Sequence, residues 1–233
     1  MVAADKYRAP VRRCHPDGTQ GVLAWSAMTQ PADDLRHEFG DIDIYLFDQL
    51  HRGRIVDGMR LLDAGCGRGR NLVYLVRRGF DVCGTDVNEA AIAGARRMAS
   101  ELAPRLPADN FHVEPVERMS FADSWFDVVI SSAVMHFARD EQHWHAMLAE
   151  MWRVLRPGGL FFARLATTIG HESRVRHITG RRYVMPDGEE RFLVDEDFIM
   201  DATRELGGVL VDPLKTSVVQ NARSMMTWVI QKK

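Results

Sequence analysis

The sequence predicts an α/β fold, with an open and mainly parallel sheet covered by helices on both faces. Strand-like apolar runs alternate with amphipathic helical segments along the chain. The run 126–131 has a continuous Val-Val-Ile centre, which is typical of a parallel strand buried on both faces. Glycines follow the apolar run 59–62, where a strand would turn into a helix.

Composition and charge narrow the function classes. The chain has 233 residues, 46% hydrophobic and 27% charged, which is ordinary for one large globular domain. A net charge of −2 gives no bulk attraction to nucleic acid or to an anionic membrane. No apolar run approaches the roughly 20 residues that span a bilayer. The scattered cysteines Cys14, Cys66 and Cys83 form neither a disulfide framework nor a zinc motif, and they suit a reducing cytoplasm.

The chain divides into a tail and one domain. Residues 1–34 lack sustained periodicity and contain several prolines and glycines, so we expect an N-terminal tail without a signal peptide. Met28 is an alternative candidate initiator. Residues 35–233 are expected to form the domain. Within it, the polar and irregular segment 170–194 is a candidate substrate lid or insert.

Helices and strands follow from spacing and capping signals. Apolar residues spaced by three or four predict a first helix over about 35–50. Asn88, Asp140 and Asp195 are expected N-caps of later helices. The last two strands are close enough for an antiparallel hairpin. The remaining expected helices are 70–78, 89–102, 141–155 and 196–206, and the expected strands are 59–62, 81–85, 110–116, 126–131, 160–163, 209–219 and 224–231.

The strongest chemical signal is the glycine-rich segment 61–71. Gly65, Gly67 and Gly69 allow a sharp turn after a strand and a close approach of ligand to backbone. Asp86 ends the next strand, 21 residues after Gly65. An ionised Asp offers two acceptor oxygens to the hydroxyls of a ribose. Together, the glycine-rich segment and Asp86 indicate a nucleoside site. Alone, the glycines are equally typical of a tight strand–helix turn, and Asp86 of a helix cap.

Two ligand classes use such a site, nicotinamide dinucleotides and S-adenosylmethionine. Dinucleotide sites favour G-x-G-x-x-G, but here the spacing is G-x-G-x-G and Arg70 stands at the last glycine position. Asp63 precedes the loop. A carboxylate there would repel a pyrophosphate, whereas it would help to hold a cationic amino-acid group, directly or through water.

Further segments extend the pattern over about residues 35–233. With them, the sequence resembles the class I S-adenosylmethionine-dependent methyltransferases. The segments that carry the resemblance are Asp63–Gly67, Asp86, 119–129, 131–137 and Glu150 with 153–159. Within that family, 69–75, 134–137 and the ending 226–233 look most like the tellurite-resistance, TehB-like branch.

The resemblance implies a Rossmann-like, seven-stranded, mainly parallel sheet whose antiparallel last strand lies between the fifth and sixth. It implies S-adenosyl-L-methionine as cofactor, with Asp63, Gly65 and Gly67 at the methionine end and Asp86 on the ribose. Pro115 departs from the family, which often has an acid there, so Val116 and Glu117 are the expected adenine neighbours. The full set of implied cofactor residues is Asp63, Gly65, Cys66, Gly67, Asn71, Asp86, Val87, Val116, Glu117 and Ser131.

The methyl-transfer site is expected beside Ser131 and His136. Transfer from a sulfonium is an in-line displacement that positioning alone can serve. If a general base acts, His136 is the best placed, because it follows the fourth strand at the ligand-binding edge of the sheet; the alternative is a core histidine. His143 and His145 do not share a helix face, and no metal site is expected.

Acceptor specificity is expected in the N-terminal helix, the segment 134–137 and the insert. The insert carries a cluster of arginines, which could grip an anionic substrate or could be an ordinary solvated surface. These arginines are Arg174, Arg176, Arg181 and Arg182.

The sequence thus predicts a cytoplasmic methyltransferase that acts on a small molecule, as a monomer or homodimer. A nucleic acid substrate and a membrane are not expected, since 131–134 reads Ser-Ser-Ala-Val rather than the motif of base-amine methylation. The alternatives are an NAD(P)-dependent oxidoreductase and a non-catalytic protein that binds S-adenosylmethionine.

Overall fold

The computed structural model describes residues 30–220 and 222–233, and their side chains from residue 35 onward. The expected tail, including Met28, therefore lies almost entirely outside the described residues. Helix α1 (Gln30–Phe39) begins before residue 35, where we expected the domain to start. In the described residues no helix is both long and apolar enough to cross a membrane.

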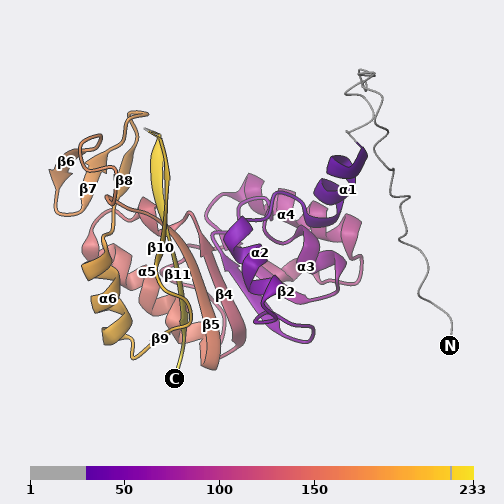
Figure 1. Cartoon of the computed structure of the whole chain (residues 1–233). Coiled ribbons are helices and arrows are strands. Elements are labelled where there is room, and N and C mark those ends of the chain that lie inside the picture. The colour runs from indigo at the N-terminus through magenta and orange to yellow at the C-terminus, as the bar shows by residue number, and fades with distance from the viewer. Residues whose placement is uncertain (1–29, 221) are drawn as a thin grey trace, which may run out of the picture.

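A central sheet with the predicted topology organises the domain (Figure 1). Its order is β10-β11-β5-β4-β1-β2-β3, and the five strands from β5 to β3 are parallel. Strand β11 runs antiparallel to both β5 and β10, as the resemblance implied. The strands are β1 (Arg60–Ala64), β2 (Asp81–Asp86), β3 (Phe111–Val113), β4 (Phe126–Ser132), β5 (Leu155–Ala166), β10 (Lys215–Val219) and β11 (Arg223–Gln231).

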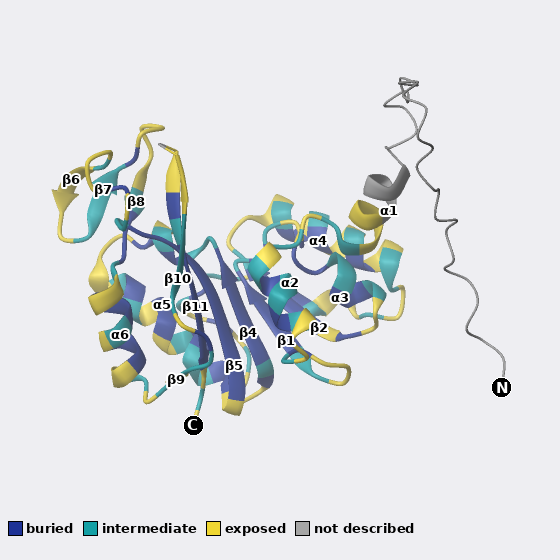
Figure 2. Cartoon of the chain, viewed as in Figure 1, coloured by how far each residue is buried: buried dark blue, intermediate teal, exposed yellow. Residues whose placement is uncertain are grey.

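Helices cover both faces of this sheet. One apolar cluster joins α5 and α6 to one face, and a second joins α2, α3 and α4 to the other. Figure 2 shows the buried residues along the middle strands, between these two layers. Asn88, Asp140 and Asp195 cap their helices as expected. The helices are α2 (Ile44–His51), α3 (Val73–Arg77), α4 (Glu89–Leu102), α5 (Glu141–Val154) and α6 (Glu196–Glu205).

The prediction of one helix over 35–50 was wrong, because the chain breaks there into α1 and α2. Gly40 adopts φ +63°, a left-handed conformation that ends a helix. Asp43 then starts α2, since its carboxylate accepts a hydrogen bond from the Tyr45 backbone N–H at 2.9 Å. The apolar periodicity continues through the break and so concealed it.

The prediction of one strand over 209–219 was also wrong. The segment forms β9 (Val209–Leu210) and β10, and β9 pairs with β11 to make an eighth strand. Pro213 lies between them and lacks the N–H that a ladder requires. The Asp212 carboxylate turns inward, where it accepts two hydrogen bonds from Arg54, at 2.6 and 3.1 Å, and one from Gln49 at 3.2 Å.

The segment 170–194 is more regular than expected. It holds a separate antiparallel sheet of three strands, β6 (Arg176–Thr179), β7 (Arg182–Val184) and β8 (Glu190–Phe192). All four residues of its edge strand β6 are exposed, which explains the polar sequence. In Figure 1 this small sheet lies above α6, beside the upper part of the hairpin of β10 and β11.

Replacing Asp212 tests the buried connection between α2 and the end of β9. Hydrogen bonds from Arg54 hold the pKa of Asp212 below its ordinary value. We expect Asp212→Asn to lower the free energy of unfolding by about 1–3 kcal/mol at pH 7, because it leaves the guanidinium without its partner. The carboxylate stabilises the fold only when ionised, so the loss should shrink as the pH falls below about 4.

Urea denaturation of wild type and variant at pH 7 and pH 3.5 measures this effect. The exposed Asp57, changed to Asn, is the control and should alter stability little. An equal loss at both pH values would contradict the ion-pair account.

Candidate active site

The glycine loop begins where β1 ends. Gly65, Gly67 and Gly69 all have positive φ, of +81°, +55° and +83°. The backbone N–H groups of Gly65 and Cys66 both donate to the Thr85 carbonyl at 2.8 Å, which fastens the loop to the end of β2. A Cβ on Gly65 would lie 2.4 Å from Val134 Cγ2, whereas a Cβ on Gly67 would meet nothing within 4 Å. The loop is thus packed on one side and open at Gly67.

Asp86 lies at the end of β2, directly beside this loop. One carboxylate oxygen accepts from the Gly67 N–H at 2.9 Å, and the other accepts from the Asn88 N–H at 2.8 Å. A carboxylate oxygen has more than one acceptor position, so each retains capacity for a ligand hydroxyl. The two backbone bonds fix the carboxylate in place without saturating it.

Asp63 is the most unusual charge of the site. It is 1% exposed, and among the described residues neither carboxylate oxygen makes a hydrogen bond of normal geometry, although the Asn71 side chain interacts with it. Burial raises its pKa to about 7, although Arg70 and Asn71 act in the opposite direction. An unsatisfied buried carboxylate is costly, and a cationic ligand group would relieve that cost. The α-ammonium group of S-adenosylmethionine is such a cation.

A cavity of about 630 Å³ opens beside the loop and Asp86, and we call it the nucleoside cavity. Val87 and Phe137 are 70% and 59% exposed on its wall, so apolar surface is available to a flat ring. Five predicted cofactor residues line it together. The lining consists of Gly65, Asp86, Val87, Pro115, Val116, Glu117, Ala133, Val134, Phe137, Arg139, His143 and Met147.

The wall around Val116 and Glu117 is held in place by α5. Glu150 accepts from the Met119 N–H at 2.8 Å, and Arg153 donates to the Met119 carbonyl at 3.2 Å. Arg153 also donates to Glu150 at 2.7 Å, and these bonds raise the pKa of its guanidinium. The Glu-x-x-Arg segment thus fixes the loop behind the expected adenine position. Glu117 Oε1 itself lies 3.1 Å from His143 Nε2.

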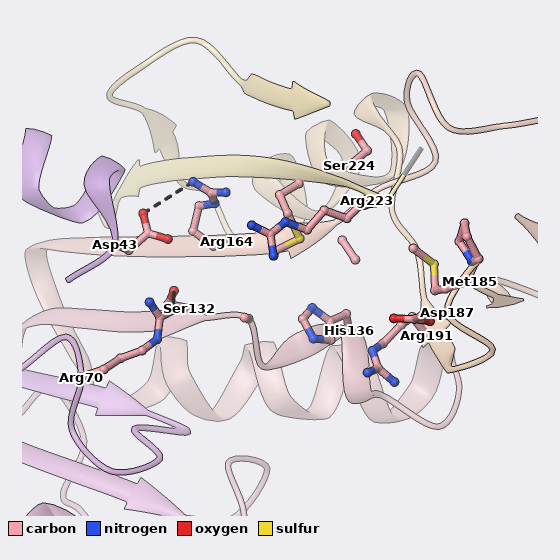
Figure 3. A pocket seen from close by; sticks show the side chains of 15 residues that line it. Asp43, Arg70, Ser132, His136, Arg164, Met185, Asp187, Arg191, Arg223 and Ser224 are labelled. Carbon is pink, nitrogen blue, oxygen red and sulfur yellow. Dashed lines mark hydrogen bonds and ion pairs between the residues drawn. The ribbon is translucent and has the colours of Figure 1, made fainter. Parts of the chain in front are cut away.

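A second cavity, of about 750 Å³, adjoins the first, and we call it the arginine cavity (Figure 3). Ala133 lines both cavities and has φ +65°, which is rare for a residue with a Cβ. Strained backbone of this kind is typical of functional sites. The lining consists of Asp43, Arg70, Ser132, Ala133, His136, Arg164, Ala166, Met185, Pro186, Asp187, Arg191, Ala222, Arg223, Ser224 and Met225.

His136 lies in the short 3₁₀ helix η3 (Met135–Phe137) and lines the arginine cavity. Burial lowers its pKa to about 4, and the positive charge of Arg191 adds to that effect. Its Nδ1 atom has no hydrogen-bond partner in the described chain. The imidazole is therefore neutral at pH 7 and able to accept a proton.

Five predicted cofactor residues line neither cavity: Asp63, Cys66, Gly67, Asn71 and Ser131. Cys66 is buried against Gly84, and burial raises the pKa of its thiol. Asn71 accepts from the Asp43 N–H at 3.0 Å and so joins the loop to the start of α2. Ser131 is fully buried in β4, while its neighbour Ser132 faces the arginine cavity.

The insert contributes to the arginine cavity through different residues from those expected. Arg181 binds Asp195 at 2.7 Å and covers the Phe198 ring. Arg182 pairs with Glu190, so neither arginine points to a ligand. Instead Met185, Pro186, Asp187 and Arg191 line the cavity. Of the two interpretations of the insert arginines, the pairing of Arg181 and Arg182 within the insert and with α6 favours a structural role for these two.

Sequence reasoning missed Asp43, Arg164 and Arg223. They come from the start of α2, from β5 and from the last hairpin, so no local motif joins them. Arg70 was visible as a departure in the glycine loop, but it gave no sign of facing a second cavity. Within residues 30–220 and 222–233, no three His, Cys, Asp or Glu side chains are placed to hold a metal ion.

Replacing Gly65 tests the packed side of the loop. In Gly65→Ala the new Cβ combines a left-handed backbone with the clash against Val134, so we expect unfolding to become easier by about 2–4 kcal/mol. Gly58→Ala is the matched control, because Gly58 has φ +87° with no atom within 4 Å of an added Cβ. It should cost about 1–2 kcal/mol, measured by urea denaturation. Equal losses would mean that Val134 does not constrain the loop, and adding Val134→Ala to Gly65→Ala should restore part of the difference.

Known proteins that are similar in sequence to this chain are methyltransferases. Residues 62–163 match the family described as a methyltransferase domain. The ubiquinone biosynthesis O-methyltransferase of Maricaulis maris is 33% identical over 171 residues, which are 70% of this chain and 64% of that protein. The chain thus spans slightly less than two thirds of that relative.

Two solved structures share the fold. One is Burkholderia thailandensis 1,6-didemethyltoxoflavin-N1-methyltransferase, with bound 1,6-didemethyltoxoflavin and S-adenosylhomocysteine; it has 18% identity, a TM-score of 0.64 and coverage of 97% of this chain and 94% of that one. The other is TehB from Haemophilus influenzae, with 17% identity, a TM-score of 0.60 and coverage of 80% and 62%. At these identities the likeness is one of fold. Residues 62–163 thus match a methyltransferase domain, and the strand order and the fold shared with these S-adenosylmethionine-type enzymes agree with that match.

Proposed function

We propose that the chain transfers a methyl group from S-adenosylmethionine to a small-molecule acceptor. The observation that carries the proposal is the pair of cavities that meet at Ala133. One contains Asp86 and the open loop, and the other contains His136. Such an arrangement allows a cofactor and an acceptor to be held on opposite sides of one short stretch of backbone.

Residues of the nucleoside cavity and of the neighbouring segment 63–67 supply the cofactor contacts in this proposal. Asp63 neutralises the ammonium group, Asp86 accepts from the ribose hydroxyls, and Val87 and Val116 flank the adenine. Gly67 allows close approach, because no atom lies within 4 Å of the position of its missing Cβ. Bound S-adenosylmethionine supplies a methyl group already activated on a sulfonium. The TehB-like branch remains a prediction from sequence.

His136 is the proposed general base. Its neutral imidazole is ready to accept the proton that an acceptor hydroxyl, thiol or amine loses. With a pKa of about 4 it is a weak base in the free protein. His136 is therefore better suited to deprotonate an acceptor with an acidic proton than to deprotonate an alcohol. Ser131 lies next to this site in the chain, and Ser132 is the better-placed hydroxyl.

The two alternative functions have less support. A dinucleotide would bring its pyrophosphate to the glycine loop, where the buried Asp63 carboxylate would repel it. The oxidoreductase is therefore disfavoured. A non-catalytic binder would need no acceptor cavity, yet one of about 750 Å³ adjoins the nucleoside cavity.

The proposal also covers the location of the enzyme, the size of its acceptor and its oligomeric state. We infer a cytoplasmic enzyme, supported by the free, buried thiols of Cys66 and Cys83. We infer a small acceptor rather than nucleic acid, supported by the size of the arginine cavity, about 750 Å³, and by the net charge of −2. The proposal includes action as a monomer or homodimer, and residues 170–194 as the insert that covers the acceptor.

Binding of S-adenosylhomocysteine tests the cofactor assignment directly. Isothermal titration of the full chain should give micromolar binding, with NADH and NADPH as controls that do not bind. Asp86→Ala should weaken the binding at least about ten-fold, because a buried charge-assisted contact is lost. The exposed Asp57→Ala should leave it unchanged. Binding of a nicotinamide cofactor, or unchanged affinity in Asp86→Ala, would overturn the assignment.

The pH dependence of the same binding tests Asp63. The carboxylate is half protonated near pH 7 in the free protein, and a bound ammonium group favours its charged form. S-adenosylhomocysteine carries this ammonium group, so binding below pH 7 should expel a proton, and the affinity should fall as the pH decreases from 8 to 6. Titrations in buffers of different ionisation enthalpy measure the proton release. Asp63→Asn should abolish the proton release. If the release persists in this variant, another group is its source.

A further inference from the structure

Arginines dominate the charged lining of the arginine cavity. Four of them face two aspartates there, and His136 is neutral. The positive charge gathers at one end, where Figure 3 shows Arg70, Arg164 and Ser132 near Asp43, with Arg223 reaching in from the hairpin. This end lies away from Met185 and Asp187 of the insert.

Arg164 is the most deeply placed of these cations. It is 9% exposed, and its only ion-pair contact among the described residues is with Asp43 Oδ1, at 3.5 Å. Its Nε–H is buried and has no partner in the described chain. One face of the guanidinium lies 4.4 Å from the centre of the Tyr45 ring. A group with five donors thus has one long contact, so its hydrogen-bonding capacity is largely unused.

The surroundings do not neutralise Arg164. Burial lowers the pKa of its guanidinium, and the charges of Arg223 and Arg70 lower it further. The single opposing carboxylate, Asp43, is already committed to the Tyr45 N–H as the cap of α2. Like charges held together at a buried place are unfavourable unless an anion joins them.

Ser132 connects the same arginines. It pairs in register with Arg164 across β4 and β5, and its hydroxyl accepts from Arg70 at 3.1 Å. The hydroxyl proton is left to donate elsewhere. Guanidinium groups and one O–H therefore line the same end of the cavity, which is the kind of donor set that an oxyanion needs.

We propose that Arg70, Arg164 and Arg223, with Ser132, form an anion clamp that binds a carboxylate or phosphate group of the methyl acceptor. The clamp deepens the proposed function. It rests on that function in one respect, namely that the molecule bound in the arginine cavity is the methyl acceptor. Ala166, Met185 and Met225 line the rest of the cavity, so the acceptor has an apolar body behind its anionic end. A negative charge on the acceptor would also raise the pKa of His136 and make it a stronger base.

The clamp can be tested without any cofactor, by titrating the full chain with three probes of similar size. These are benzoate, phenyl phosphate and neutral benzamide, followed by NMR or calorimetry at millimolar concentration. We expect at least one anion to bind about ten-fold or more tightly than benzamide. The ratio of benzoate to phenyl phosphate distinguishes a planar from a tetrahedral anionic group.

Two variants and one control assign the binding to the clamp. Arg223→Gln removes an exposed arginine, so the fold is kept, and it should weaken anion binding about ten-fold while leaving benzamide unchanged. Arg164→Lys retains the positive charge but loses the planar, forked guanidinium group, so it should also weaken anion binding. Arg97→Gln, on the outer surface of α4, is the matched control and should have no effect.

The outcomes separate this proposal from the proposed function. Equal binding of benzamide and the anions, or unchanged anion binding in Arg223→Gln, would overturn the clamp. S-adenosylhomocysteine titrated into the same variants should bind as in the wild type. Failure of the wild type to bind S-adenosylhomocysteine would overturn the proposed function instead, and it would leave the anion measurements standing.

Discussion

The attachment of the glycine loop to the end of β2 is the contact on which the rest of the site depends. Two N–H groups of the loop share the Thr85 carbonyl, and a third reaches the Asp86 carboxylate. These bonds are possible because β1 and β2 pair in parallel, with Ala64 opposite Thr85. The sheet register thereby decides where the carboxylate, the open face of Gly67 and the buried Asp63 lie.

Much of the fold was predictable, because its signals are local. Caps such as Asn88 and Asp195, and apolar runs such as 126–131, determine where elements start and which of them are buried. The nucleoside cavity was predictable for a similar reason. Its main residues follow strands that end at the same edge of a parallel sheet.

The arginine cavity was not predictable, because it joins positions far apart in sequence. Asp43, Arg70, Arg164 and Arg223 have no common spacing, and each alone has the pattern of a cap, a loop or a strand residue. The break at Gly40 was hidden by apolar periodicity that continues across it. The insert was hidden by its exposed edge strand, whose polar residues resemble a loop.

Asp43 gives the two cavities a common support. Its backbone N–H is bonded to Asn71 of the glycine loop, and its carboxylate faces Arg164 in the clamp while holding the first turn of α2. A ligand in either cavity that shifts Asp43 would therefore also shift a group beside the other cavity. In thermodynamic terms, such a shift would link the two ligands, and each would change the affinity of the other by the same factor.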